Sequence, residues 1–148
     1  MTRLQILIPA VLAVCSLPVF AQKSPCDLVT QTEAAVIVGS PVDKQVQPTA
    51  CIYKAKGSNI SLHVRLSKSN PTAATTAKTN FSKSGIPVKD EPSLGAGSYS
   101  AVWPNSDRIY VLKGDQMLRI DYVSTASKAP DAMMAKLRED AKKALGRL

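Results

Sequence analysis

The alternation of apolar and polar residues is clearest between Ser98 and Val123. Three runs rich in β-branched and aromatic residues are separated there by two turn signals, a pattern that predicts three consecutive antiparallel strands. A two-residue loop at Gly114-Asp115 sets the pairing of the last two strands, because glycine accepts the positive φ that such a loop requires. Counting outward from the loop places four apolar side chains on one face of the sheet: Ile109, Val111, Leu118 and Ile120.

The same register gives the opposite face two favourable cross-strand pairs. Arg108 lies opposite Asp121, and Tyr110 lies opposite Arg119, where a guanidinium can stack on the ring. Each pair contributes ~0.2–1 kcal/mol. A slip of one residue would bring isoleucine and valine opposite charged side chains, so both faces favour this register.

The strand Tyr99–Trp103 precedes this hairpin and joins it through Pro104-Asn105-Ser106. A three-residue loop would place Trp103 opposite Asp107. We expect this arrangement, in which Tyr99 and Trp103 point into the apolar face. A four-residue loop would instead turn Trp103 outward, where its ring could contact a ligand.

The first half of the chain predicts a helix followed by a hairpin. A capping box at Thr30-x-x-Glu33 marks the start of the helix, and Gly39 marks its end. Residues 40–50 contain two prolines and are expected to form a loop. Strands are expected at Cys51–Lys56 and, after a Gly-Ser-Asn turn, at Ile60–Leu66, where apolar and polar residues alternate.

Two further helices are expected. Asn70-Pro71 is a favourable helix start, with asparagine as the N-cap and proline in the first turn, and this helix is expected to end near Gly85. Residues 86–94 then form an extended connection that prolines interrupt. The last helix begins at Ala129-Pro130-Asp131, and its apolar face consists of Met134, Leu137, Ala141 and Leu145.

The predicted order of elements is therefore α-β-β-α-β-β-β-α. Strands joined by tight turns pair antiparallel, so the expected fold class is α+β, with a single antiparallel sheet and the helices packed on one of its faces. No long linker divides residues 22–148, which we interpret as one domain.

Residues 1–21 have the pattern of a signal peptide: a basic residue, an apolar run and the cleavage-site sequence Val19-Phe20-Ala21. The apolar run is too short for a stable membrane span. An alternative is a lipoprotein signal with lipid on Cys15, although Val14 is bulky where such signals have a small residue. We expect export to the periplasm or the medium, with cleavage after Ala21.

Removal of this segment leaves 127 of the 148 residues and lowers the net charge from +8 to +7. Two of the three cysteines remain, Cys26 and Cys51. An exported domain with two cysteines most simply forms one disulfide. Their spacing fits neither a zinc site nor a Cys-x-x-Cys redox motif.

Short motifs in both halves resemble a group of small bacterial exported proteins and lipoproteins. The first half carries Cys-Asp-Leu-x-Thr-x-x-Glu from Cys26 to Glu33, and the second carries Leu-Gly-x-Gly-x-Tyr from Leu94 to Tyr99. In that group an α+β domain of unknown function follows a signal sequence. The resemblance implies an envelope or secreted location and a bridge between Cys26 and Cys51, and it implies no catalytic residues.

The residues themselves form no strong catalytic or metal-binding pattern. His63 is the one histidine, so we interpret it as a surface residue. Gly95 and Gly97 precede a strand rather than a helix, and we expect them to shape a turn rather than to hold phosphate. Asp90-Glu91 is expected in a solvated loop. We therefore expect a protein without cofactor, metal or enzymatic activity; a hydrolase that uses a serine with His63 as base is the less favoured alternative.

The basic surplus is the main indication of function. A protein of this charge is attracted to polyanions such as anionic lipid, lipopolysaccharide or nucleic acid. We expect a domain that binds an envelope protein or a small ligand, and the alternative is a basic surface that binds anionic polymers. The candidate interaction surface consists of Lys54, Lys56, Arg65, Lys68 and Trp103.

Overall fold

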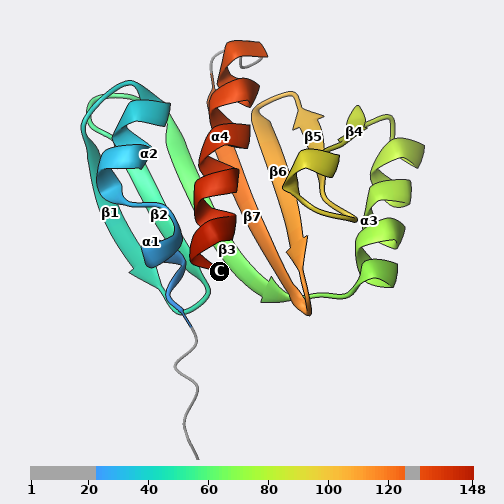
Figure 1. The fold of residues 1–148 in the computed structure, drawn as a ribbon. Helices are drawn as coiled ribbons and strands as arrows, with labels where there is room; N and C mark the ends of the chain where they lie inside the picture. Colours follow the sequence, from blue (N-terminus) through green and yellow to red (C-terminus); the bar gives the residue numbers. More distant parts are fainter. Residues whose placement is uncertain (1–22, 126–130) are drawn as a thin grey trace, which may run out of the picture.

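A computed structural model describes residues 23–125 and 131–148 (Figure 1). The expected signal peptide, the alternative lipid site Cys15 and the Ala129-Pro130 start of the last helix lie outside these residues. The elements, in chain order, are α1 (Pro25–Leu28), α2 (Gln31–Val38), β1 (Val42–Gln47), β2 (Ala50–Ala55), β3 (Ser61–Lys68), α3 (Pro71–Lys83), β4 (Val88–Asp90), the short helix η1 (Pro92–Leu94), β5 (Tyr99–Trp103), β6 (Ser106–Lys113), β7 (Gln116–Val123) and α4 (Asp131–Arg147).

Within the described ranges the strands form one seven-stranded sheet in the order β1-β2-β3-β7-β6-β5-β4. Every neighbouring pair is antiparallel. The α+β class and the single antiparallel sheet are therefore confirmed. The strands β5, β6 and β7 are consecutive and antiparallel, and we call them the meander. The pairing of β3 with β7 joins the strands of the first half of the chain to this meander.

The predicted order of elements is only partly correct, because two edge strands were expected to be irregular. Pro41 directly precedes β1, Pro48 directly follows it, and Pro87 directly precedes β4. A proline at the boundary of an edge strand removes no hydrogen bond from the ladder, so these prolines delimit the strands instead of preventing them. The expected first helix is also preceded by a separate turn of helix, α1.

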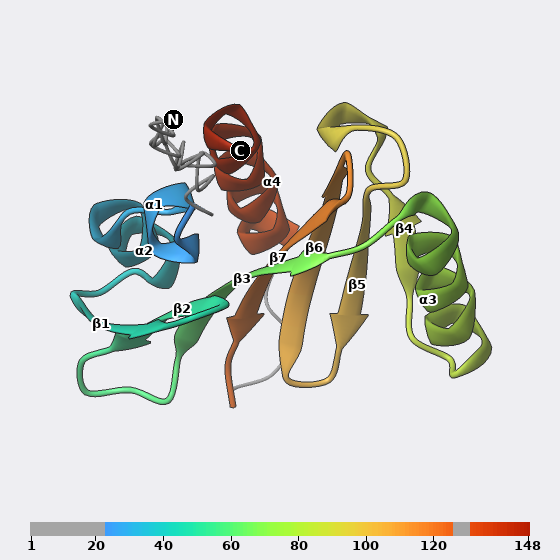
Figure 2. The ribbon, with the colours of Figure 1, turned by 90° about the horizontal axis from the view of Figure 1, so that it is seen from below.

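The expectation that all helices pack on one face is wrong. Helices α1, α2 and α4 cover one face of the sheet, whereas α3 packs on the other face, beside β4 and β5 (Figure 2). The physical reason is that the meander is apolar on both faces. Leu112 and Met117 are buried on the α3 side, together with Tyr99 and Tyr110, against which Phe81 of α3 packs.

The register of β6 and β7 is confirmed over all the pairs predicted, from Lys113 opposite Gln116 to Arg108 opposite Asp121. Gly114 has the positive φ that the two-residue turn requires, +61°. The local prediction succeeded because a tight turn fixes the pairing of the strands that it joins.

The expected positions of Tyr99 and Trp103 are both wrong, because both side chains lie on the α3 face and not on the face of Ile109. The turn between β5 and β6 has two residues, so Trp103 lies opposite Ser106 and on the α3 face, not beside Ile109. Its ring meets that of Phe81 edge-on, with centroids 5.0 Å apart, and the Arg108 guanidinium carbon lies 3.9 Å from its centroid. Trp103 is a half-buried packing residue of the small second core on the α3 side of the sheet, which includes Tyr99, Tyr110, Leu112 and Met117.

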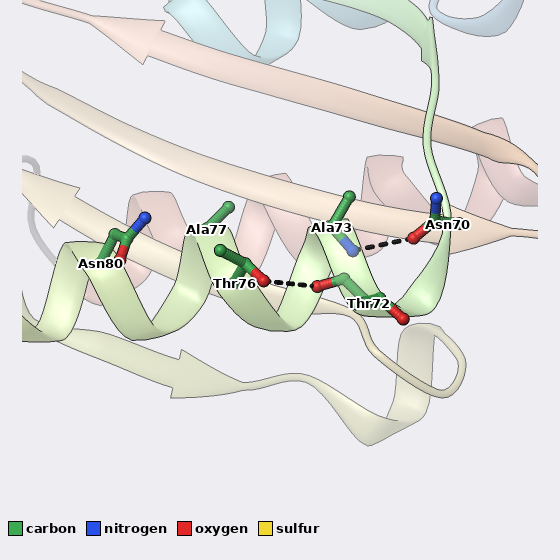
Figure 3. Close-up of a pocket in the computed structure, with 6 residues that line it drawn as sticks. All are labelled: Asn70, Thr72, Ala73, Thr76, Ala77 and Asn80. Carbon is green, nitrogen blue, oxygen red and sulfur yellow. Dashed lines mark hydrogen bonds between the residues drawn. The ribbon is translucent and has the colours of Figure 1, made fainter.

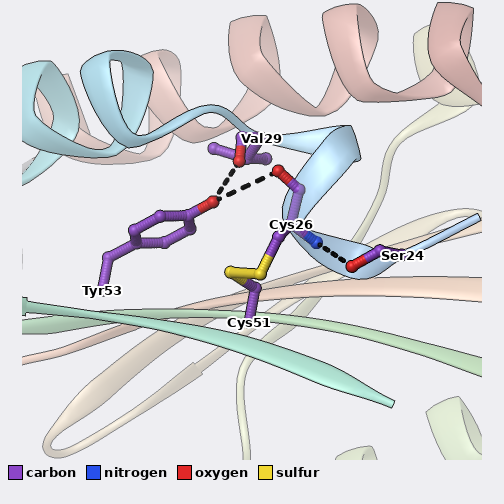
Figure 4. Close-up of a disulfide and its surroundings, with 5 residues drawn as sticks. All are labelled: Ser24, Cys26, Val29, Cys51 and Tyr53. Carbon is purple, nitrogen blue, oxygen red and sulfur yellow. Dashed lines mark hydrogen bonds between the residues drawn. A yellow bond between two sulfur atoms is a disulfide. The ribbon is translucent and has the colours of Figure 1, made fainter. Parts of the chain in front are cut away.

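The disulfide between Cys26 and Cys51 is confirmed. It joins α1 to β2, and the neighbouring Tyr53 side chain donates hydrogen bonds to the carbonyl oxygens of Val29 and Cys26 (Figure 4). Burial raises the pKa of Tyr53 to about 12, so the hydroxyl stays a donor at neutral pH. These contacts hold α1 on the sheet.

A charged pair holds α4 against the start of α2. Arg147 donates to both carboxylate oxygens of Glu33, at 2.7 and 2.6 Å, and to the carbonyl oxygen of Leu28 at 2.8 Å. Glu33 also accepts from the backbone of Thr30, which confirms the predicted capping box. The Arg147 hydrogen bonds are the main reason why the pKa of Glu33 falls to about 2.

We predict that replacing both Cys26 and Cys51 with serine lowers the free energy of unfolding by about 3–4 kcal/mol, because the bridge closes a long loop. The residues are 25 positions apart. Urea unfolding of the oxidised protein and of the double variant measures the difference. Reduced wild-type protein is the matched control, and a reductant that leaves its unfolding midpoint unchanged would contradict the prediction.

We predict that Glu33→Gln lowers the free energy of unfolding at pH 7 by about 1–2 kcal/mol. This value is smaller than the pKa shift alone would give, because solvent screens the partly exposed Arg147. The lowered pKa means that this contribution is complete above the unfolded value of 4.5 and is lost as the pH falls toward 2. Urea unfolding at several pH values measures the difference, which should shrink in that window. Glu139→Gln, on an exposed part of α4, is the control and should change little.

Candidate functional site

The candidate site lies on the face of the sheet that α1, α2 and α4 leave uncovered. Helix α3 covers this face only near β4, β5 and β6, so in the part of the chain that the structure describes no helix packs over it at β2, β3 and β7 (Figure 2). We call this region the open face. Because side chains alternate along a strand, it carries the polar set of each strand, including Lys54, His63, Arg65, Arg119 and Asp121.

Arg65 and Arg119 are direct cross-strand neighbours on the open face. Opposed like charges in a sheet are unfavourable. Arg119 is offset by Asp121, whose Oδ1 lies 3.0 Å from Arg119 Nε, off the line of a hydrogen bond. Arg65 is exposed and makes no ion pair with any described residue. The open face thus keeps a positive charge that the fold itself does not neutralise.

Asp121 is the buried centre of this cluster, with only 4 % of its surface exposed. Its Oδ1 also lies 3.8 Å from Arg108 Nε. Burial raises the pKa of its carboxyl, and the guanidiniums of Arg119 and Arg108 oppose that rise. The carboxyl therefore forms ion pairs with two arginine side chains, the closer one with Arg119.

His63 lies opposite Asp121 in the β3–β7 pairing and is half-buried rather than fully on the surface. Its Nε2 is 3.0 Å from Ser61 Oγ. Burial lowers the pKa of His63, and the Asp121 carboxyl opposes this shift. Among the described residues no group of three or more His, Cys, Asp or Glu side chains could hold a metal ion.

A pocket of about 570 Å³ opens on this face between β3 and β7. It contains three cationic side chains, and no carboxylate lines it. Tyr110 contributes a ring that is held by a stacked contact with Tyr99, with centroids 4.5 Å apart. The lining residues are Thr49, Arg65, Leu66, Ser67, Lys68, Tyr110, Met117 and Arg119.

A second hollow, of about 560 Å³, runs along α3 and has no charged lining residue (Figure 3). Two of its polar side chains already form hydrogen bonds within the helix. Asn70 Oδ1 accepts from the Ala73 backbone at 2.8 Å as the predicted N-cap, and the Thr76 hydroxyl donates to the Thr72 carbonyl at 2.9 Å. This hollow offers less chemistry than the pocket on the open face.

A third hollow, of about 440 Å³, lies between α4 and the β4–β5 edge and includes Arg138. That arginine is already paired with Glu91, which also accepts from Ser100 at 2.8 Å. The prediction that Glu91 sits in a solvated loop is wrong, because only 4 % of its surface is exposed. The pair anchors α4 to the sheet.

The structure brings together only some of the surface residues predicted from the sequence. Lys54 and Arg65 lie on the open face, and Lys68 lines its pocket. Lys56 is instead paired with Asp43 at 3.3 Å, and Trp103 lies against α3.

Sequence reasoning did not assign Tyr110, Arg119 or Asp121 to a site. Their mutual positions followed from the β6–β7 register, but their proximity to Arg65 did not. That proximity comes from the β3–β7 pairing, for which no local signal exists, since the two strands are separated by α3, η1 and three other strands.

Gly95 and Gly97 shape the turn before β5, as predicted, with φ of +109° and +79°. No protein family, curated protein or solved structure matches the chain. The resemblance to small exported bacterial proteins therefore stays a prediction. Within residues 23–125 and 131–148 no helix is long and apolar enough to cross a membrane.

We predict that Arg65→Ala changes the free energy of unfolding by no more than about 0.5 kcal/mol, since it removes an exposed charge from a repulsive pair. Arg119→Ala should lower it by about 2 kcal/mol, because the buried Asp121 loses its nearest cation. Urea unfolding distinguishes the two.

A double variant provides the control. Adding Asp121→Asn to Arg119→Ala should recover at least half of the loss, because the buried charge is then gone. Equal destabilisation by Arg65→Ala and Arg119→Ala would show that the ion pair with Asp121 does not make Arg119 more important for stability than Arg65.

Proposed function

We propose that this protein is an exported, non-enzymatic binding domain that holds a small anionic ligand of the cell envelope on its open face. The observation that carries the proposal is the opposition of Arg65 and Arg119 in a pocket without carboxylates. Two like charges side by side weaken the fold, and a bound anion turns that repulsion into attraction.

The export part of the proposal is supported by the signal-like pattern of residues 1–21 and by the disulfide. Disulfides persist in oxidising compartments such as the periplasm or the medium and are rare in the cytosol. The Cys26–Cys51 bridge also fits a domain that keeps its shape outside the cell.

The pocket favours a ligand over a long polymer. Its volume of about 570 Å³ lies in the range of small-molecule sites. Binding of an anionic polymer would draw on basic residues spread over the surface, and such binding remains the second candidate because the net charge is high.

A hydrolase is supported by one contact only, that of Ser61 Oγ with His63 Nε2 at 3.0 Å. Two features weigh against it. The carboxyl of Asp121 is paired with arginines, whereas a catalytic histidine needs a partner that orients its second nitrogen. Ser61 and His63 also lie on the inner strand β3, which pairs with β2 and β7, so its backbone N–H groups serve the strand ladders rather than an oxyanion.

We predict that the protein, produced with its own signal sequence and recovered from the envelope or the medium, binds at least one of citrate, sulfate and inorganic phosphate. Isothermal titration measures the affinity, and heparin is tested in parallel. Arg65→Ala should weaken binding of the small anion by about tenfold, because a charge-assisted hydrogen bond is lost.

The matched control is Lys136→Ala with Lys142→Ala, which removes two exposed charges from α4 on the other face. It should change the affinity less than twofold. Heparin binding that both variants weaken alike, with no small anion bound, would favour the polymer alternative. Ester turnover that Ser61→Ala abolishes would favour the hydrolase.

A further inference from the structure

The pocket on the open face has a charge excess that one carboxylate would not balance. Arg65, Lys68 and Arg119 contribute three positive charges, and no acidic side chain lines the pocket. Asp121 is not among the lining residues, and its single charge, 3.0 Å from Arg119 Nε, offsets only part of the three. A dianionic group therefore matches the pocket better than a monoanion does.

The two arginines are placed to grip one tetrahedral group. They are directly opposed in neighbouring strands, a position in which Cβ atoms lie about 5 Å apart. Guanidinium groups present planar forks of donors that match phosphate oxygens, and Lys68 adds a flexible ammonium. The hydroxyls of Thr49 and Ser67 also line the pocket and can donate to further oxygens.

Asp121 acts here as a positioning residue. Its carboxylate contacts Nε of Arg119, at 3.0 Å, while the same arginine side chain lines the pocket. An ion pair at Nε leaves the two terminal NH₂ groups of the guanidinium pointing away from the carboxylate, where a ligand can meet them. The arginine is then oriented before the ligand arrives, which reduces the entropy lost on binding.

The remaining wall of the pocket is apolar. Met117 and Tyr110 are each 7 % exposed there. The Tyr110 ring is held in a three-ring cluster with Tyr99, stacked at 4.5 Å, and Phe81, with centroids 5.9 Å apart. A rigid ring beside a cationic cluster suits a ligand that joins a phosphate to a flat or apolar group.

We propose that the pocket binds a small, soluble phosphate monoester whose phosphate lies between Arg65 and Arg119 and whose organic group lies on Tyr110 and Met117. This inference rests on the proposed function and names the class of ligand. A monoester is favoured over a diester because only the monoester carries a second negative charge near neutral pH.

Phenyl phosphate and phenyl sulfate test the inference, because they share a shape and differ by one charge at pH 8. Isothermal titration at equal ionic strength should show phenyl phosphate binding about tenfold more tightly or better. Arg65→Ala should remove most of this preference. Lys83→Ala, which removes an exposed charge from α3 on the same side of the sheet but outside the pocket, should keep it.

The outcomes separate the two proposals. Equal, Arg65-dependent affinity for the two esters would overturn the monoester assignment and leave the anion site intact. No Arg65-dependent binding of either ester, citrate, sulfate or inorganic phosphate would overturn both. Binding to phosphatidic acid vesicles, but not to phenyl phosphate, would overturn the small-ligand assignment in favour of a lipid headgroup.

Discussion

The pairing of β3 with β7 is the interaction on which the rest of the molecule depends. It extends over the whole length of both strands and joins the disulfide-linked first half to the meander. On one face it places Val64 beside Ile120 in the core beneath α4. On the other face it places Arg65 beside Arg119. The same backbone ladder therefore builds both the core and the candidate site.

The charged groups of this protein fall into two kinds. Glu33 with Arg147 and Glu91 with Arg138 are closed pairs in which each arginine grips its carboxylate through several contacts, and both pairs anchor α4. The cluster around Asp121 is different, because more guanidiniums surround it than its single charge can balance. Unbalanced positive charge beside a pocket, rather than the overall basic composition, is what supports a binding role.

The sheet is apolar on both faces in its second half, and this explains the position of α3. A sheet with one apolar face would have needed helices on one side only. Here a second small core, centred on Tyr99, Tyr110 and Phe81, needs a cover of its own. Helix α3 provides it, and by stopping short of β3 it leaves the arginines accessible.

The sequence by itself determined the elements whose interactions are local. The β6–β7 register, the capping box at Thr30 and the N-cap at Asn70 each depend on residues only a few positions apart, so their patterns could be read directly. Only the tertiary structure decided which face α3 covers and that Arg65 meets Arg119. These outcomes depend on contacts between distant segments, whose choice is set by the packing of the whole chain and not by any short pattern.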